Sequence, residues 1–150
     1  MYLSMLMSIK RERKFMDKEV SVLSKYRYEK AREEIKAASM LLNDKLYASS
    51  LNRSYYAIFH SVRSLFAFIK IDSKTHNGIK LLFDQNYIKT GLIEKMYSEI
   101  LRNAFIIRQK SDYNDFYIAS KAEAEKQIQN AKLFMDRINK YINENYIKKL

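Results

Sequence analysis

Two residues of this sequence, Arg53 and His60, have the chemistry and the spacing to form a site. In an α-helix, residues seven positions apart are separated by about 700°, so these two fall within roughly 20° of one face, about 10 Å apart along the axis. A guanidinium is a permanent cation, and an imidazole can accept or donate a proton near neutral pH. The spacing therefore predicts one groove with a fixed cation and a proton-transfer group, and with Tyr56 between them.

A purely structural role is the alternative for the same pair. A histidine close to Phe59 and Val62 on an apolar helix is often a core residue that bonds a backbone carbonyl. In that case Arg53 would pair with a carboxylate such as Asp112. The residues by themselves leave both interpretations open.

The helix that carries the pair is predicted over residues 45–70, because apolar residues recur there at steps of three or four for six turns. Its far half is apolar almost all round, which predicts a place at the centre of the fold or at a subunit contact. The same periodicity predicts a first helix over residues 20–43. Asn43 and Asp44 close that helix, and Asp44 is well suited to cap the next one.

Three more helices are predicted after these two. A short helix runs through residues 79–83, a fourth helix covers residues 92–107, and a last helix follows a capping box formed by Ser120 and Glu123. The polar stretch 108–113 is predicted to be a loop. The sequence therefore predicts an all-α fold, an antiparallel up-and-down helical bundle of four long helices plus one short helix.

Composition narrows the class of protein. The 150 residues fit one domain, and the presence of two glycines and no proline favours long helices with short connections. The absence of cysteine excludes a disulfide framework, a thiol nucleophile and a thiolate metal site, and with only two histidines we expect no metal site and no cofactor. The net charge of +11 would attract RNA, although such lysine-rich compositions also occur in proteins from AT-rich genomes.

Residues 1–18 are predicted to be an extension, and residues 19–150 the helical domain. The first nine residues are mostly apolar and precede a basic cluster, the reverse of the order in a secretory signal. We expect the extension to be flexible, to pack in a dimer, or to result from an early start codon with Met16 as the alternative start; a membrane-surface anchor is a further alternative. No apolar run approaches the roughly 20 residues that cross a bilayer, so we expect a cytoplasmic protein without a membrane partner.

The string Asn-Arg-Ser-Tyr-Tyr-Ala-Ile-Phe-His, residues 52–60, resembles the motif of the HEPN family. These small helical proteins of toxin–antitoxin and RNA-processing systems carry an arginine, four to six intervening residues, and a histidine. The spacing here is six, and the resemblance covers about residues 25–141. It extends to further landmarks of one prokaryotic branch of that family: Tyr47-Ala48, Thr75-His76-Asn77-Gly78, Lys89-Thr90-Gly91-Leu92, and Arg108 followed by Asp112-Tyr113.

This resemblance implies a metal-independent endoribonuclease. His60 would act as general base on the ribose 2′-OH or as general acid on the leaving 5′ oxygen, and Arg53 would hold the scissile phosphate. Ser54, directly after the arginine, would position the phosphate or the guanidinium. The implied products are a 2′,3′-cyclic phosphate and a free 5′-OH. In the family the site is typically composite, formed where two motif helices meet, so a homodimer is implied as well.

RNA or nucleotide binding is expected from four further residues: Tyr56, Arg63, His76 and Arg108. Tyr56 could stack on a base, whereas at helical spacing at least one residue of the pair Tyr55 and Tyr56 belongs to the core. His76 is most simply a helix-start or turn residue.

Two other functions stay open. One is a non-catalytic nucleotide-binding or partner-binding module paired with a minimal nucleotidyltransferase, and the other is a structural bundle whose basic face binds RNA without cutting it. In HEPN toxins regulated by such a nucleotidyltransferase, a tyrosine two residues after the motif histidine commonly receives the nucleotide. This sequence has Val62 there, which excludes modification at that position and leaves simple contact with such a partner possible.

Overall fold

The structure, a computed structural model, describes residues 1–147 except for the side chains of residues 13–16. The side chains of Met16, the alternative start, and of Arg13 and Lys14 in the basic cluster therefore lie outside the described part, as do residues 148–150 of the expected domain. Every regular element in the described part is helical. The elements are α1 (Tyr2–Asn43), α2 (Tyr47–Phe66), α3 (His76–Phe83), α4 (Lys95–Tyr113) and α5 (Lys121–Ile142), with single turns at Ala67–Ile69, Asp84–Ile88 and Asn143–Ile147.

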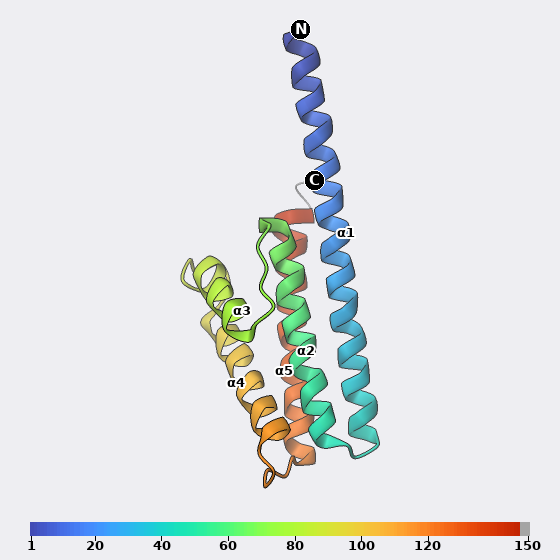
Figure 1. The fold of residues 1–150 in the computed structure, drawn as a ribbon, viewed down its shortest axis with the longest axis vertical. Coiled ribbons are helices and arrows are strands. Elements are labelled where there is room, and N and C mark those ends of the chain that lie inside the picture. The colour runs from blue at the N-terminus through green and yellow to red at the C-terminus, as the bar shows by residue number, and fades with distance from the viewer. Residues whose placement is uncertain (148–150) are drawn as a thin grey trace.

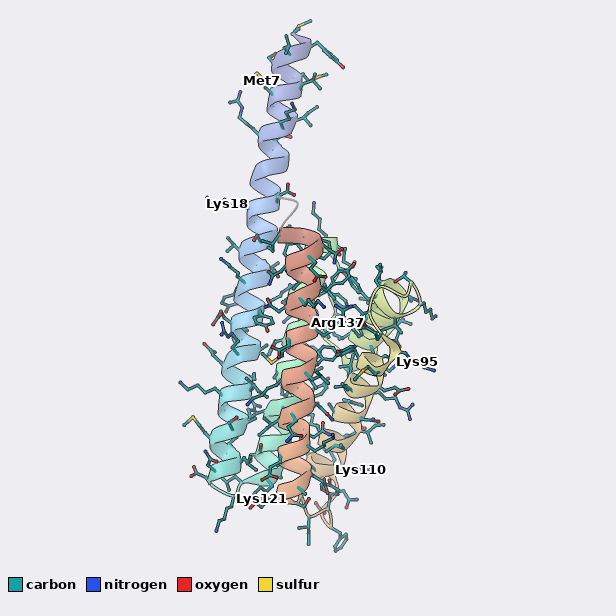
Figure 2. All side chains as sticks on the ribbon, turned by 180° about the vertical axis from the view of Figure 1, so that it is seen from behind. Met7, Lys18, Lys95, Lys110, Lys121 and Arg137 are labelled. Atoms are coloured by element: carbon teal, nitrogen blue, oxygen red, sulfur yellow. The ribbon has the colours of Figure 1, made fainter. Side chains whose placement is uncertain are left out.

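The four long helices run alternately up and down, and α3 lies beside α4 (Figure 1). Helix α2 is central, since it packs against α1, α4 and α5. Seen from behind, α5 lies between α1 and α4 and covers the back of α2 (Figure 2). The predicted all-α bundle of four long helices and one short helix is confirmed.

A stripe of small residues on α2 lets the neighbouring helices approach closely. Its members recur at steps of three or four and are fully buried: Ser50, Ser54, Ala57, Ser61 and Ser64. On α1, Ala31 and Ala38 are also fully buried, and the Ser50 hydroxyl donates to the Ala38 carbonyl at 2.8 Å. Small side chains remove the steric limit on the distance between helix axes, and an internal acceptor satisfies the buried hydroxyl.

Helix α1 begins at Tyr2, although the sequence predicted a start near residue 20. Residues 2–12 are exposed, and this end of α1 projects beyond the bundle (Figure 1). The stretch contains no glycine or proline and is rich in good helix formers, so a helix that the bundle already holds can propagate into it at low cost. Despite this length, no helix among the described residues is apolar enough over a sufficient span to cross a bilayer.

Two further predictions about element ends are wrong. Asp44 closes α1 but does not cap α2, whose first turn follows Leu46 without a side-chain cap. Lys45 between them takes a left-handed conformation, with φ at 63°, and this turns the chain. The stretch 108–113, predicted as a loop, is the end of α4, where Arg108 pairs with Asp112 one turn later at 3.2 Å.

The start of α5 follows the predicted capping box in part. The Ser120 hydroxyl accepts a hydrogen bond from the Glu123 backbone N–H at 3.1 Å. The Glu123 carboxylate instead accepts a hydrogen bond from the Tyr117 hydroxyl. All six apolar positions predicted for this helix are buried, so its heptad-like stripe packs within the monomer: Ala124, Ile128, Ala131, Met135, Ile138 and Ile142.

At the start of α3, Gly78 lies close to the side chain of Ser73. The Thr75 side chain caps α3 by accepting from the Gly78 N–H at 3.0 Å, and a Cβ at position 78 would lie 2.8 Å from the Ser73 Cβ. Gly78→Ala should therefore lower the free energy of unfolding, measured in urea, by about 1–3 kcal/mol. In a Ser73→Gly background the loss should shrink, because the opposing Cβ is gone. Equal losses in both backgrounds would contradict this explanation.

Candidate functional site

One stripe of α2 remains open between its neighbours. From Leu51 to the end of the helix, all but five residues are buried, and the five partly exposed ones lie at helical spacing. This side of α2 lies between α1 and α4, since Arg53 contacts Glu34 of α1 and Asn52 contacts Asp112 of α4, and no other helix in the described part of the chain lies in front of α2 there (Figure 1). We call these five residues the motif face: Asn52, Arg53, Tyr56, His60 and Arg63.

Arg53 is held by a chain of polar contacts that crosses three helices. Its guanidinium pairs with Glu34 of α1 at 2.9 Å and donates to the Asn52 side-chain oxygen at 2.6 Å. The Asn52 amide donates at 2.8 Å to Asp112 of α4, which also pairs with Arg108. The pairing of Arg53 with Asp112 considered above is therefore wrong, because α1 places Glu34 within reach. The Arg53 side chain is 38% exposed, so the guanidinium stays accessible.

His60 is half-buried and has no bond to a backbone carbonyl among the described residues. Its Nδ1 atom is covered and has no hydrogen-bond partner there. Burial, together with the nearby cations Arg63, Lys30 and Arg53, lowers the pKa of His60 to about 4. The ring is therefore neutral at physiological pH and able to accept a proton. An unpaired buried polar atom costs stability, and such atoms recur at catalytic sites.

Arg63, at the other end of the motif face, is tied to the segment that follows α2. It makes two hydrogen bonds to Asp72, at 2.9 and 2.7 Å, and Arg27 of α1 contacts the same carboxylate at 3.1 Å. The bond from Arg63 holds the pKa of Asp72 below its usual value. This pairing fixes the guanidinium and neutralises part of its charge.

Ser54 does not lie on the motif face. It is fully buried, and its hydroxyl has no hydrogen-bond partner in the described structure. A step of one residue turns a helix by about 100°, which moves position 54 from the open stripe onto the small-residue stripe. Val62 is fully buried as well, so the position two residues after the motif histidine is inaccessible.

A pocket of about 300 Å³ adjoins the motif face between α2, α3 and α4. We call it the aromatic pocket. Tyr56 lines it, and His76 opposite hydrogen bonds through Nδ1 to the Tyr55 hydroxyl at 3.2 Å and stacks on Phe105 with ring centroids 3.6 Å apart. The Arg108 guanidinium lies 5.0 Å from the centre of the Tyr56 ring. The structure thus brings Tyr56, His76 and Arg108 together, and Arg63 lies apart from them on the motif face.

Three residues near the motif face were missed by the sequence analysis: Arg27, Lys30 and Glu34. They recur at steps of three and four along α1, which was the available signal. Their relevance depends on how α1 is aligned along α2, and spacing within one helix does not contain that information. Among the described residues, no group of three or more histidine or acidic side chains could hold a metal ion.

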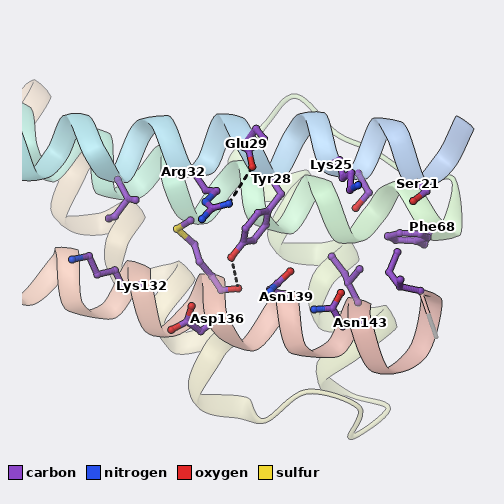
Figure 3. Close-up of a pocket in the computed structure, with 15 residues that line it drawn as sticks. Ser21, Lys25, Tyr28, Glu29, Arg32, Phe68, Lys132, Asp136, Asn139 and Asn143 are labelled. Atoms are coloured by element: carbon purple, nitrogen blue, oxygen red, sulfur yellow. Dashed lines mark hydrogen bonds and ion pairs between the residues drawn. The ribbon is translucent and has the colours of Figure 1, made fainter. Parts of the chain in front are cut away.

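A larger groove of about 600 Å³ lies on the other side of the bundle, between α1 and α5 (Figure 3). Tyr28 crosses it and donates to the Met135 carbonyl at 3.3 Å. Its lining combines both charges, for example Lys25 and Asp136. It shares no lining residue with the motif face.

The fold and the site together, a helical bundle whose central helix carries an arginine and a histidine seven positions apart on its open side, are those of the family that the sequence motif suggested. The family model for the HEPN domain matches residues 24–141, and the chain belongs to this family. It is 36% identical over 114 residues to "Putative toxin MJ0605" of Methanocaldococcus jannaschii, covering 76% of this chain and 84% of that protein. It is 31% identical over 121 residues to "Putative toxin MJ0142" of the same organism, and 29% identical over 115 residues to a "UPF0332 protein" of Thermotoga maritima. These two alignments cover 80% and 77% of this chain, and 82% and 87% of the respective relatives.

Acid should weaken the fold through the two histidines. Burial lowers the pKa of both His60 and His76 to about 4, from a usual value of 6.5, so the unfolded chain binds more protons between these values. The stability from keeping each ring neutral is complete above the unfolded-state pKa and is lost as the pH falls from there toward about 4. Urea unfolding at about pH 7.5 and about pH 5 should show a smaller drop in stability for His76→Gln than for the wild type. An equal drop would contradict the shifted pKa of His76.

Proposed function

We propose that this protein is a toxin-type, metal-independent endoribonuclease of the cytoplasm that acts as a homodimer. The observation that carries the proposal is the motif face, where Arg53, Tyr56, His60 and Arg63 are open to solvent while every other residue of α2 after Leu51, except Asn52, is buried. Solvent-accessible cations beside a neutral imidazole suit binding and cleavage of a phosphodiester.

The chemistry needs no metal. Neutral His60 accepts the proton of a ribose 2′-OH, and the 2′ oxygen attacks the adjacent phosphorus. The bond from phosphorus to the 5′ oxygen breaks, and the imidazolium returns its proton to that leaving oxygen. Arg53 binds the phosphate and stabilises the negative charge that builds on it. The products are a 2′,3′-cyclic phosphate and a free 5′-OH. The proton taken from the 2′-OH ends on the 5′ oxygen, and the imidazole is neutral again.

A second copy of the chain would complete the site. Within one copy, Arg53 and His60 start from backbone positions about 10 Å apart along the helix axis, so a second copy could supply the group that faces each of them across one phosphate. Two motif faces meeting across a two-fold axis would bring two arginines and two histidines into one cleft. The net charge of +11 would favour RNA entry into that cleft.

The first test separates catalysis from structure. His60→Ala and Arg53→Gln should each lower the rate of RNA cleavage in EDTA by about a hundredfold or more, with unchanged circular dichroism. The matched control is Glu34→Gln, which removes the ion pair of Arg53 but keeps the guanidinium and should retain cleavage. If His60→Ala still cleaves, the proposal fails; if Glu34→Gln matches Arg53→Gln, the arginine has only a structural role.

The composite site can be tested with mixed dimers. Differently tagged Arg53→Ala and His60→Ala chains are coexpressed, and the heterodimer is isolated through both tags. It should regain cleavage that neither homodimer shows, since one cleft then contains one intact arginine and one intact histidine. Absence of activity in a well-formed heterodimer would rule out sharing of the site between copies.

A second function rests on a different observation. Both guanidiniums of the motif face are already paired with carboxylates, Arg53 with Glu34 and Arg63 with Asp72, which suits a non-catalytic module that binds a nucleotide or a minimal nucleotidyltransferase partner. This alternative expects copurification with such a partner and no cleavage by the wild type. Cleavage that requires His60 would exclude it.

A further inference from the structure

The aromatic pocket is continuous with the motif face through one side chain. The centre of the Tyr56 ring lies 5.2 Å from the guanidinium of Arg53, on the motif face, and 5.0 Å from the guanidinium of Arg108, in the pocket. A ligand bound in the pocket would therefore lie next to any phosphate held by Arg53.

The lining of the pocket selects for a planar anion. Its walls include the rings of Tyr56, Phe59 and His76, and its charged lining residues, Lys74 and Arg108, are both cations. No acidic residue lines it in the described structure, in contrast to the groove between α1 and α5. Aromatic walls favour a flat ring and the cations favour a phosphate, and a nucleotide combines both.

We infer that the aromatic pocket binds one nucleotide of an RNA, its base against the aromatic rings and its phosphate near Lys74 and Arg108. A volume of about 300 Å³ is at the lower end of the range for small-ligand sites and suits a single nucleotide. That this nucleotide flanks the cleaved bond rests on the proposed function. Binding of a nucleotide in the pocket does not depend on that proposed function.

Two polar groups in the pocket can distinguish one base from another. The hydrogen bond between the Tyr55 hydroxyl and His76 Nδ1 fixes the imidazole, and where the hydroxyl donates, His76 Nε2 carries the proton and is a donor. The exposed Asn77 side chain supplies both a donor and an acceptor. Such groups read the edge of a base, so the pocket should impose a sequence preference at one position beside the cut.

Binding is tested on the full chain carrying His60→Ala, which removes cleavage from the measurement. Titration with AMP, GMP, CMP and UMP, followed by NMR, should show preferred binding of one or two of the four. Lys74→Glu should weaken that binding about tenfold, because it replaces an attractive charge with a repulsive one. The matched control Lys126→Glu changes the charge equally on α5, far from the pocket in sequence, and should have little effect.

Cleavage of a randomised RNA pool by the wild type supplies the second arm. The products should share a base preference at one position beside the cut, and Asn77→Ala should relax that preference relative to the wild type. Nucleotide binding that depends on Lys74 without any cleavage would remove the nuclease and keep the pocket. Cleavage with no base preference, together with equal binding by Lys74→Glu and Lys126→Glu, would overturn the nucleotide pocket and keep the nuclease.

Discussion

The burial of α2 on three sides is the constraint on which the rest of the structure depends. Its small residues allow α1 to pack closely, with a hydrogen bond from Ser50 to the Ala38 carbonyl, and its large apolar residues form the core with α4 and α5. A helix enclosed in this way has a single narrow stripe left for polar side chains. The motif face occupies that stripe, so the packing that stabilises the bundle also decides which side chains can meet a ligand.

Electrostatics at the motif face depends on closely spaced cations and on the carboxylates that pair with them. Arg53 and Arg63 stand on the same stripe as His60, and carboxylates from α1 and from the segment after α2 offset part of their charge. The side chains of these pairs are partly exposed, and such pairs contribute little stability. Their effect is to hold each guanidinium in one place, while burial of the ring, together with the nearby cations, lowers the pKa of His60 and keeps the imidazole unprotonated.

Much of this could be predicted from the sequence. Helical periodicity placed the five helices, the core residues of α2 and α5, and the shared face of Arg53 and His60, because a helix fixes relations among residues a few positions apart. It did not give Glu34 as the partner of Arg53, since that contact depends on how two helices slide past each other. It also missed the helical state of residues 108–113, a polar stretch in which Arg108 and Asp112 pair one turn apart. Ser54 was assigned to the site because it follows Arg53 directly in the sequence. The next residue of a helix points about 100° away, and at position 54 this direction is the buried side of α2.

The polar chain that runs from Glu34 through Arg53, Asn52 and Asp112 to Arg108 joins both outer helices to the central one. It links α1 to α4 across the motif face, and the Arg53 guanidinium is one of its members. The distance between α1 and α4 and the position of the Arg53 guanidinium are therefore coupled. A ligand that drew Arg53 away from Glu34 or Asn52 would also weaken the connection between α1 and α4. Conversely, a change in the distance between these helices would move the guanidinium.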